Sequence, residues 1–149
     1  FLTLSGLATI TDEQATSLSK VRELFLWGLT SMSDAQAESL SHNGTLCFPN
    51  LTTMSNAQAE SLSKATGLYL DGLTTITDAQ AESLSNVKSL LCGLTTINDV
   101  QAESLSKVKN LQLIGLTSIT DAQAKSLSKV TNLNISQDLE PLIDKFKNK

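Results

Sequence analysis

The chain has 149 residues, 40% of them hydrophobic and only 4% aromatic, which predicts one domain with an aliphatic core. Its net charge of −4 argues against a nucleic-acid-binding protein, because that function needs a basic face. No stretch reaches the roughly 18 consecutive apolar residues of a membrane-spanning helix, so no membrane span is predicted. The chain begins inside a repeat at Phe1 rather than with Met, which leaves upstream segments and the compartment open.

A unit of 21 or 22 residues repeats along the chain, and each unit opens with an L-x-L segment. The first leucine of that segment recurs after 22, 22, 22, 22, 21 and 22 residues, at Leu2, Leu24, Leu46, Leu68, Leu90, Leu111 and Leu133. The one short step reflects a missing residue within 90–96. Apolar and variable residues alternate in these segments, which predicts short strands with one buried face. Repetition at this period indicates a solenoid whose stacked units share one core.

Each predicted strand leads through a turn to a short helix. The turn carries a G-L-T-x-I segment, whose recurrent glycine is interpreted as a turn residue. Each helix begins with a capping box, an N-cap side chain followed three residues later by Gln. The caps, in chain order, are Thr11, Ser33, Ser55, Thr77, Asn98 and Thr120. Asp fills five of the six first-turn positions, where the helix dipole favours negative charge. Glu60 with Lys64, and Glu103 with Lys107, are expected to pair within their helices.

Over residues 1–136 this pattern resembles the leucine-rich-repeat family. The G-L-T-x-I-T-D segment at 72–78 is similar to the G-C-x-x-I-T-D turn of its cysteine-containing class, with Leu in place of Cys and a shorter repeat. It is also similar to repeats of bacterial surface proteins, although their Ala-Phe and Cys are missing. We predict a right-handed α/β solenoid of about six repeats, with parallel strands on the concave face and short helices on the convex face. The resemblance implies a binding scaffold that uses its concave sheet and carries no catalytic residues.

The two ends of the chain differ. Residues 137–149 leave the repeat pattern and are predicted to form a helix that caps the solenoid 1–136. Pro141 would lie in its first turn if Asp138 acts as the N-cap. Nothing comparable precedes Phe1, so the N-terminal edge is expected to expose apolar side chains.

No catalytic, metal or cofactor site is predicted. His42 is the only histidine, and we interpret it as a solvated loop residue. The column of first-turn Asp residues could be read as a calcium ladder, but helix dipoles explain Asp there and Asn56 interrupts the column. Cys47 and Cys92 lie two repeats apart, about 10 Å between strands, so two free thiols are expected.

The repeats differ most at outward strand positions, and three of the six aromatic residues fall there. Phe25, Trp27 and Tyr69 are expected to project from adjacent strands and form one exposed patch. Drift between duplicated repeats would explain variation at these positions, but not this accumulation of aromatic residues. The predicted ligand-binding surface comprises Phe25, Trp27, Cys47, Pro49, Tyr69, Asp71, Leu91, Gln112 and Ile114.

Three functions were weighed on this basis. The first is a protein- or peptide-binding scaffold that uses the concave face of repeats two to four. The second is a structural element that stacks or self-associates through its uncapped N-terminal edge. An enzyme is the third and the least supported, because no nucleophile lies beside a base.

Overall fold

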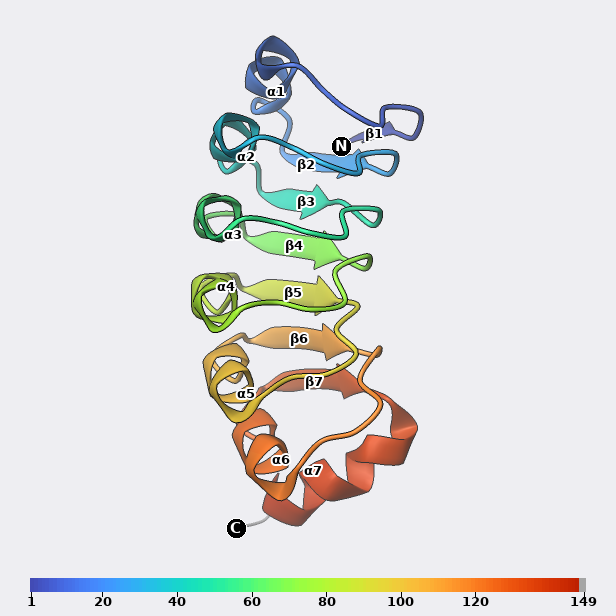
Figure 1. The fold of residues 1–149 in the computed structure, drawn as a ribbon, viewed down its shortest axis with the longest axis vertical. Coiled ribbons are helices and arrows are strands. Elements are labelled where there is room, and N and C mark those ends of the chain that lie inside the picture. Colours follow the sequence, from blue (N-terminus) through green and yellow to red (C-terminus); the bar gives the residue numbers. More distant parts are fainter. Residues whose placement is uncertain (148–149) are drawn as a thin grey trace.

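Short strands and short helices alternate along the chain in the computed structural model, which describes residues 1–147 (Figure 1). The strands of the described residues are β1 (Leu2–Leu4), β2 (Glu23–Leu26), β3 (Thr45–Cys47), β4 (Gly67–Leu70), β5 (Ser89–Cys92), β6 (Asn110–Leu113) and β7 (Asn132–Ile135). The helices are α1 (Asp12–Leu18), α2 (Asp34–Leu40), α3 (Asn56–Leu62), α4 (Asp78–Leu84), α5 (Asp99–Leu105), α6 (Asp121–Leu127) and α7 (Glu140–Lys147), with a 3-10 turn at Gln137–Leu139. None of these helices is long and apolar enough to cross a membrane.

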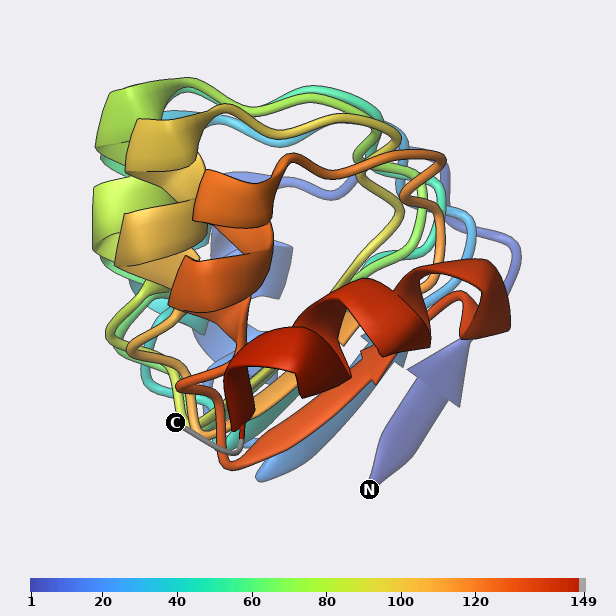
Figure 2. The ribbon, with the colours of Figure 1, turned by 90° about the horizontal axis from the view of Figure 1, so that it is seen from below.

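The seven strands form one parallel sheet in the order of the sequence. Their register places the repeated leucines side by side, for example Leu24, Leu46 and Leu68. The sheet is one wall of a right-handed solenoid, and α1–α6 stack along another (Figure 2). The predicted fold class is therefore confirmed.

The core is aliphatic and follows the repeat. In the second unit Leu24, Leu26 and Leu29 have no exposed surface, and the helix contributes Ala37 and Leu40. Full burial of a leucine contributes roughly 1.5–3 kcal/mol, so the stacked columns supply most of the stabilisation. Helices of seven residues are too short to be stable alone, and they depend on this packing.

All six predicted capping boxes are present. Five of the six glutamines, all but Gln14, also join neighbouring repeats, which the sequence analysis did not foresee. Gln58 Nε2 donates to the Met32 carbonyl at 2.8 Å, one repeat earlier, while its Oε1 accepts from the Ser55 amide. Gln36, Gln80, Gln101 and Gln123 make the equivalent bonds to Ile10, Met54, Ile76 and Ile97. Each of these five glutamines thus caps its own helix and bonds it to the preceding unit.

The first-turn acidic residues also bond to the next repeat. Asp34 accepts a hydrogen bond of 2.7 Å from the Ser55 hydroxyl, and Asp78 accepts one of 2.7 Å from the side-chain Nδ2 of Asn98. At the end of the solenoid Lys145 of α7 donates to Asp121 at 2.6 Å. The helix dipole is therefore only part of the reason for Asp at these positions.

The expected ion pairs within helices were wrong. Lys64 binds Glu38 of the preceding repeat at 2.9 Å, because α3 ends at Leu62 and the lysine lies beyond it. The same offset explains two further pairs, Lys107 with Glu82 at 3.2 Å and Lys129 with Glu103 at 3.0 Å. Hydrogen bonds from Ser61 and Lys64 lower the pKa of Glu38. These exposed pairs are screened by water and align repeats more than they stabilise them.

The recurrent glycines are required by packing between repeats and not by turn conformation. No glycine in residues 1–147 has a positive φ. A Cβ atom at Gly28 would lie 2.7 Å from the Ser5 carbonyl oxygen and 2.8 Å from that of Leu7, both in the preceding repeat. At Gly6, which has no preceding repeat beside it in the structure, a Cβ would meet nothing within 4 Å. The interpretation as turn residues is corrected accordingly.

Asn43 is an exception within the core. It replaces the inward valine of other repeats, such as Val87, and only 3% of it is exposed. Its Nδ2 donates to the Leu18 and Val21 carbonyls, but its Oδ1 has no hydrogen-bond partner. A buried acceptor without a hydrogen-bond partner is unfavourable, so Asn43 makes this repeat less stable than one with valine at the same position.

The two ends differ as expected. Leu2, Leu4 and Leu7 at the N-terminal edge are only partly buried, whereas their counterparts in the next repeat are fully buried. At the other end α7 crosses the last repeat (Figure 2) and buries Ile143.

The details of the cap differ from the prediction. Asp138 lies inside the 3-10 turn, which begins after Ser136 and has no side-chain cap. Asp138 is therefore not the N-cap of α7, although Pro141 does lie in the first turn of that helix. Residues 148–149 of the predicted cap lie outside the described residues.

Candidate binding face

The face of the sheet that is turned away from the core, here called the outer sheet face, carries the candidate residues in rows. Strand pairing aligns one row across the solenoid: Thr3, Phe25, Cys47, Tyr69, Leu91, Gln112 and Asn134. In β2 and β6, for example, these residues alternate with fully buried leucines, which places the row outward. Trp27, Asp71 and Ile114 each directly follow a strand, namely β2, β4 and β6, and Pro49 lies two positions after β3. Trp27 and Ile114 are more than half exposed.

Phe25 and Trp27 lie together at the N-terminal end of the outer sheet face. They line a shallow hollow of about 350 Å³ with Phe1, Thr3 and Glu23, here called the aromatic hollow. Trp27 is 53% exposed, which is unusual for the largest apolar side chain of the protein. The sequence-based grouping of Phe25 with Trp27 agrees with this geometry.

Tyr69 does not join this group. Phe25 pairs in register with Cys47, and Cys47 pairs with Tyr69, so strand β3 separates the two rings. Cys47 is only 9% exposed and contributes little surface between them. The expectation that Phe25, Trp27 and Tyr69 project from adjacent strands was therefore wrong.

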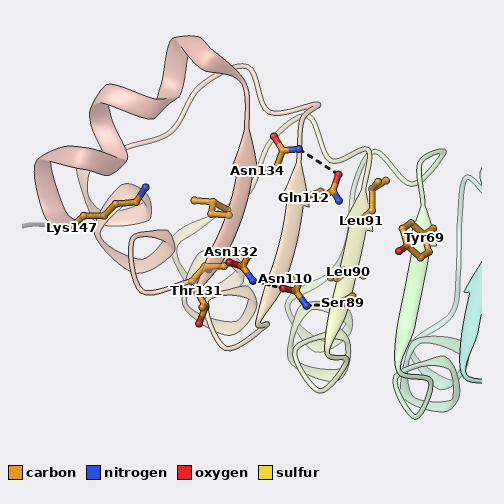
Figure 3. Close-up of a pocket in the computed structure, with 12 residues that line it drawn as sticks. Tyr69, Ser89, Leu90, Leu91, Asn110, Gln112, Thr131, Asn132, Asn134 and Lys147 are labelled. Carbon is orange, nitrogen blue, oxygen red and sulfur yellow. Dashed lines mark hydrogen bonds between the residues drawn. The ribbon is translucent and has the colours of Figure 1, made fainter.

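Tyr69 instead lines a second and larger hollow, about 580 Å³ in volume, which spans β4 to β7 (Figure 3). Its uncharged polar lining consists of Ser89, Asn110, Gln112, Thr131, Asn132 and Asn134. We call it the amide hollow. Leu91 adds apolar surface next to Tyr69, and Lys147 of α7 lies at the far end.

The amide side chains are ordered by bonds to one another. Asn132 Nδ2 donates to Asn110 Oδ1 at 2.6 Å, and Asn110 Nδ2 donates to the Ser89 hydroxyl at 2.9 Å. In the next row Asn134 Nδ2 approaches Gln112 Oε1 at 3.5 Å. The result is two parallel rows of polar groups from successive strands.

Sequence reasoning missed the first of these rows. Ser89, Asn110 and Asn132 stand immediately before the L-x-L leucine, and only the two later outward positions were considered. A signal was present, because this position also varies between repeats, from Glu23 and Thr45 onwards. Extending the alternation of inward and outward residues to the position before the L-x-L leucine would have predicted this row.

Both cysteines are free and buried. Burial, with a smaller contribution from Asp71, raises the pKa of Cys47 to about 11 and that of Cys92 to about 12. Both thiols are therefore protonated at neutral pH and poor nucleophiles.

We expect a thiol reagent to count two thiols per chain in denaturant and to react far more slowly with folded protein. Because burial disfavours the thiolate, the thiols ionise at a lower pH in the unfolded chain than in the folded protein. Ionisation therefore stabilises the unfolded chain relative to the folded state. Stability should thus be intact below the ordinary thiol pKa of 9.0 and fall as the pH rises from there towards 11. Urea midpoints across this range measure the loss, which should be smaller in Cys92→Ala. Rapid labelling of the folded chain would contradict the burial of both thiols.

Within residues 1–147 no group of three or more His, Cys, Asp or Glu side chains could hold a metal ion. The Asp column instead accepts hydrogen bonds between repeats, as at Asp34 and Asp78. His42 is exposed, and its Nδ1 lies 3.3 Å from the Ser39 carbonyl.

No family model matches the chain, and no curated protein matches it.

Proposed function

We propose that the chain is a binding scaffold of the leucine-rich-repeat kind, which recognises a protein or peptide through its outer sheet face. One observation carries the proposal: Trp27 is 53% exposed beside Phe25 in a protein with only 4% aromatic residues. Exposed apolar patches usually mark interaction sites, and Trp is enriched among the residues that dominate binding energy.

The scaffold beneath this patch is rigid, which favours binding. Leu24 and Leu26, which flank Phe25 along β2, are completely buried. The backbone is paired to both neighbouring strands. A partner would therefore meet a preformed surface and lose less conformational entropy on association.

Replacing Trp27 with alanine should weaken partner binding roughly thirtyfold, because a central aromatic anchor typically accounts for ~2 kcal/mol. Stability should change little, since an exposed residue leaves no cavity. Ligands are first selected from a displayed peptide library on the wild-type chain, and their affinities are then measured for each variant. Val100→Ala is the matched control, because Val100 is a similarly exposed apolar residue on α5. Equal affinity for wild type and Trp27→Ala would contradict the proposal.

The N-terminal edge supports one alternative, self-association of the chain. Leu4, Leu7 and Leu18 line an apolar hollow of about 290 Å³ at this edge. Sedimentation that depends on concentration, and that is abolished by Leu4→Asp but not by Trp27→Ala, would favour this alternative over a peptide scaffold.

A further inference from the structure

We propose that the amide hollow over β4 to β7 is a binding site for an uncharged oligosaccharide. The site lies on a different part of the outer sheet face from the aromatic hollow and does not depend on the function proposed there. It is carried by three features of the lining: the ordered amides, the near absence of charge and the partly exposed ring of Tyr69 (Figure 3).

The amides retain hydrogen-bonding capacity towards the hollow. A carboxamide offers two N–H donors and two acceptor lone pairs. Gln112 is engaged only through Oε1, so both N–H groups of its Nε2 have no protein acceptor among the described residues. Asn132 donates one N–H to Asn110, and its own Oδ1 accepts from no described residue. The floor therefore offers both free donors and free acceptors, which suits hydroxyl groups because each hydroxyl both donates and accepts.

Charge restricts the ligand further. Among the described residues of the lining, Lys147 is the only charged one, and it is paired with Asp144 at 3.2 Å. Within residues 1–147 no carboxylate lines the hollow to attract a cation. A ligand with many hydroxyl groups and no net charge matches this surface better than an acidic or basic one.

The apolar part of the lining fits the same class. Tyr69 and Leu91 are half-buried neighbours in one row and form one side of the hollow. A sugar ring has an apolar C–H face as well as a rim of hydroxyls, and that face can pack on the tyrosine ring. Successive strands repeat the amides at about 4.8 Å, which suits a chain of repeated units.

A peptide fits the hollow less well. The cores of protein interfaces are rich in aromatic residues and Arg, with fully desolvated anchors. In the part of this lining that the structure describes, only Tyr69 is aromatic and no Arg is present. The aromatic hollow at the other end offers such anchors, so the two hollows differ in the ligand chemistry they suit.

The test uses ¹⁵N-labelled protein titrated with maltohexaose, cellohexaose and chitin hexasaccharide. At least one sugar should shift the side-chain amide resonances of Asn110, Gln112 and Asn132 while that of Asn86 stays fixed. Asn86 provides the matched control, since its amide lies outside the hollow and bonds to the Ser83 carbonyl. Gln112→Ala should weaken this binding about tenfold, which corresponds to about 1.4 kcal/mol, and Asn86→Ala should not. Circular dichroism verifies that each variant is folded.

Three outcomes would overturn the proposal. One is the absence of shifts in the hollow for all three sugars at up to about 10 mM, a concentration that detects very weak binding. Another is sugar binding that Gln112→Ala and Tyr69→Ala leave unchanged. The third is tighter binding at the same amides by a capped peptide of alanine, serine and asparagine, which would make the hollow a peptide site.

Discussion

Alanine at Gly93 is expected to destabilise the fold by roughly 3 kcal/mol, the upper part of the usual range for overpacking. The added Cβ would overlap with the carbonyl oxygen of Asp71 in the preceding repeat. Neither backbone can move away easily, because β4 and β5 are paired up to Leu70 and Cys92, directly before these residues. Urea unfolding followed by circular dichroism gives the change in stability.

Gly6→Ala is the matched control, with the same substitution at the same repeat position. A Cβ at Gly6 meets nothing within 4 Å, and no glycine of residues 1–147 has a positive φ. This variant should therefore be neutral or gain about 0.4–1 kcal/mol through the lower entropy of its unfolded chain. Equal destabilisation by the two substitutions would show that the turn itself needs glycine and that packing between repeats is not the cause.

Gln80→Ala is expected to cost about 2–3 kcal/mol, because it removes two hydrogen bonds at a position only 6% exposed. Gln80 Nε2 donates to the Met54 carbonyl at 2.7 Å, and its Oε1 accepts from the Thr77 amide at 2.8 Å. Both backbone groups would lose their partners. The thermal midpoint and the urea midpoint should fall together.

Gln14→Ala measures the contribution of the capping bond alone. Gln14 accepts from the Thr11 amide at 2.9 Å and donates to no earlier repeat in the structure. It should lose about 1 kcal/mol, the ordinary value of a helix cap. The difference between the two variants then measures the tie between repeats, and no difference would mean that the tie contributes nothing.

The fold could be predicted because its signals are local and repeated. Alternation in the L-x-L segments predicted the strand faces, and the capping boxes located the starts of α1 to α6, for example at Thr77. Contacts between repeats were missed because they depend on how closely the units stack. Gln80 and Lys64 have ordinary roles in their own helix or loop, and only the stacked structure shows that each reaches the preceding unit.

The candidate face was predicted less completely. The alternation of apolar and variable residues correctly predicted that Phe25 and Tyr69 lie on the outer sheet face. It did not predict which side chain lies between their rings. Cys47 separates the rings, and the burial of its side chain depends on its neighbours across the sheet. The amide hollow depends on Asn132 and Asn110 meeting across two strands, a pairing that residue type alone does not reveal.

The side-chain hydrogen bonds between repeats all have the same polarity along the chain. Within the described residues, each side-chain hydrogen bond between repeats is donated by the later residue to the earlier one, as Gln36 donates to Ile10 and Lys145 to Asp121. A ribosome takes about 1–4 s to add the 22 residues of one repeat, whereas a short helix forms within about a microsecond. Once the first units have packed together, each emerging unit therefore finds its acceptors already in place, and the chain can fold repeat by repeat while it is being made.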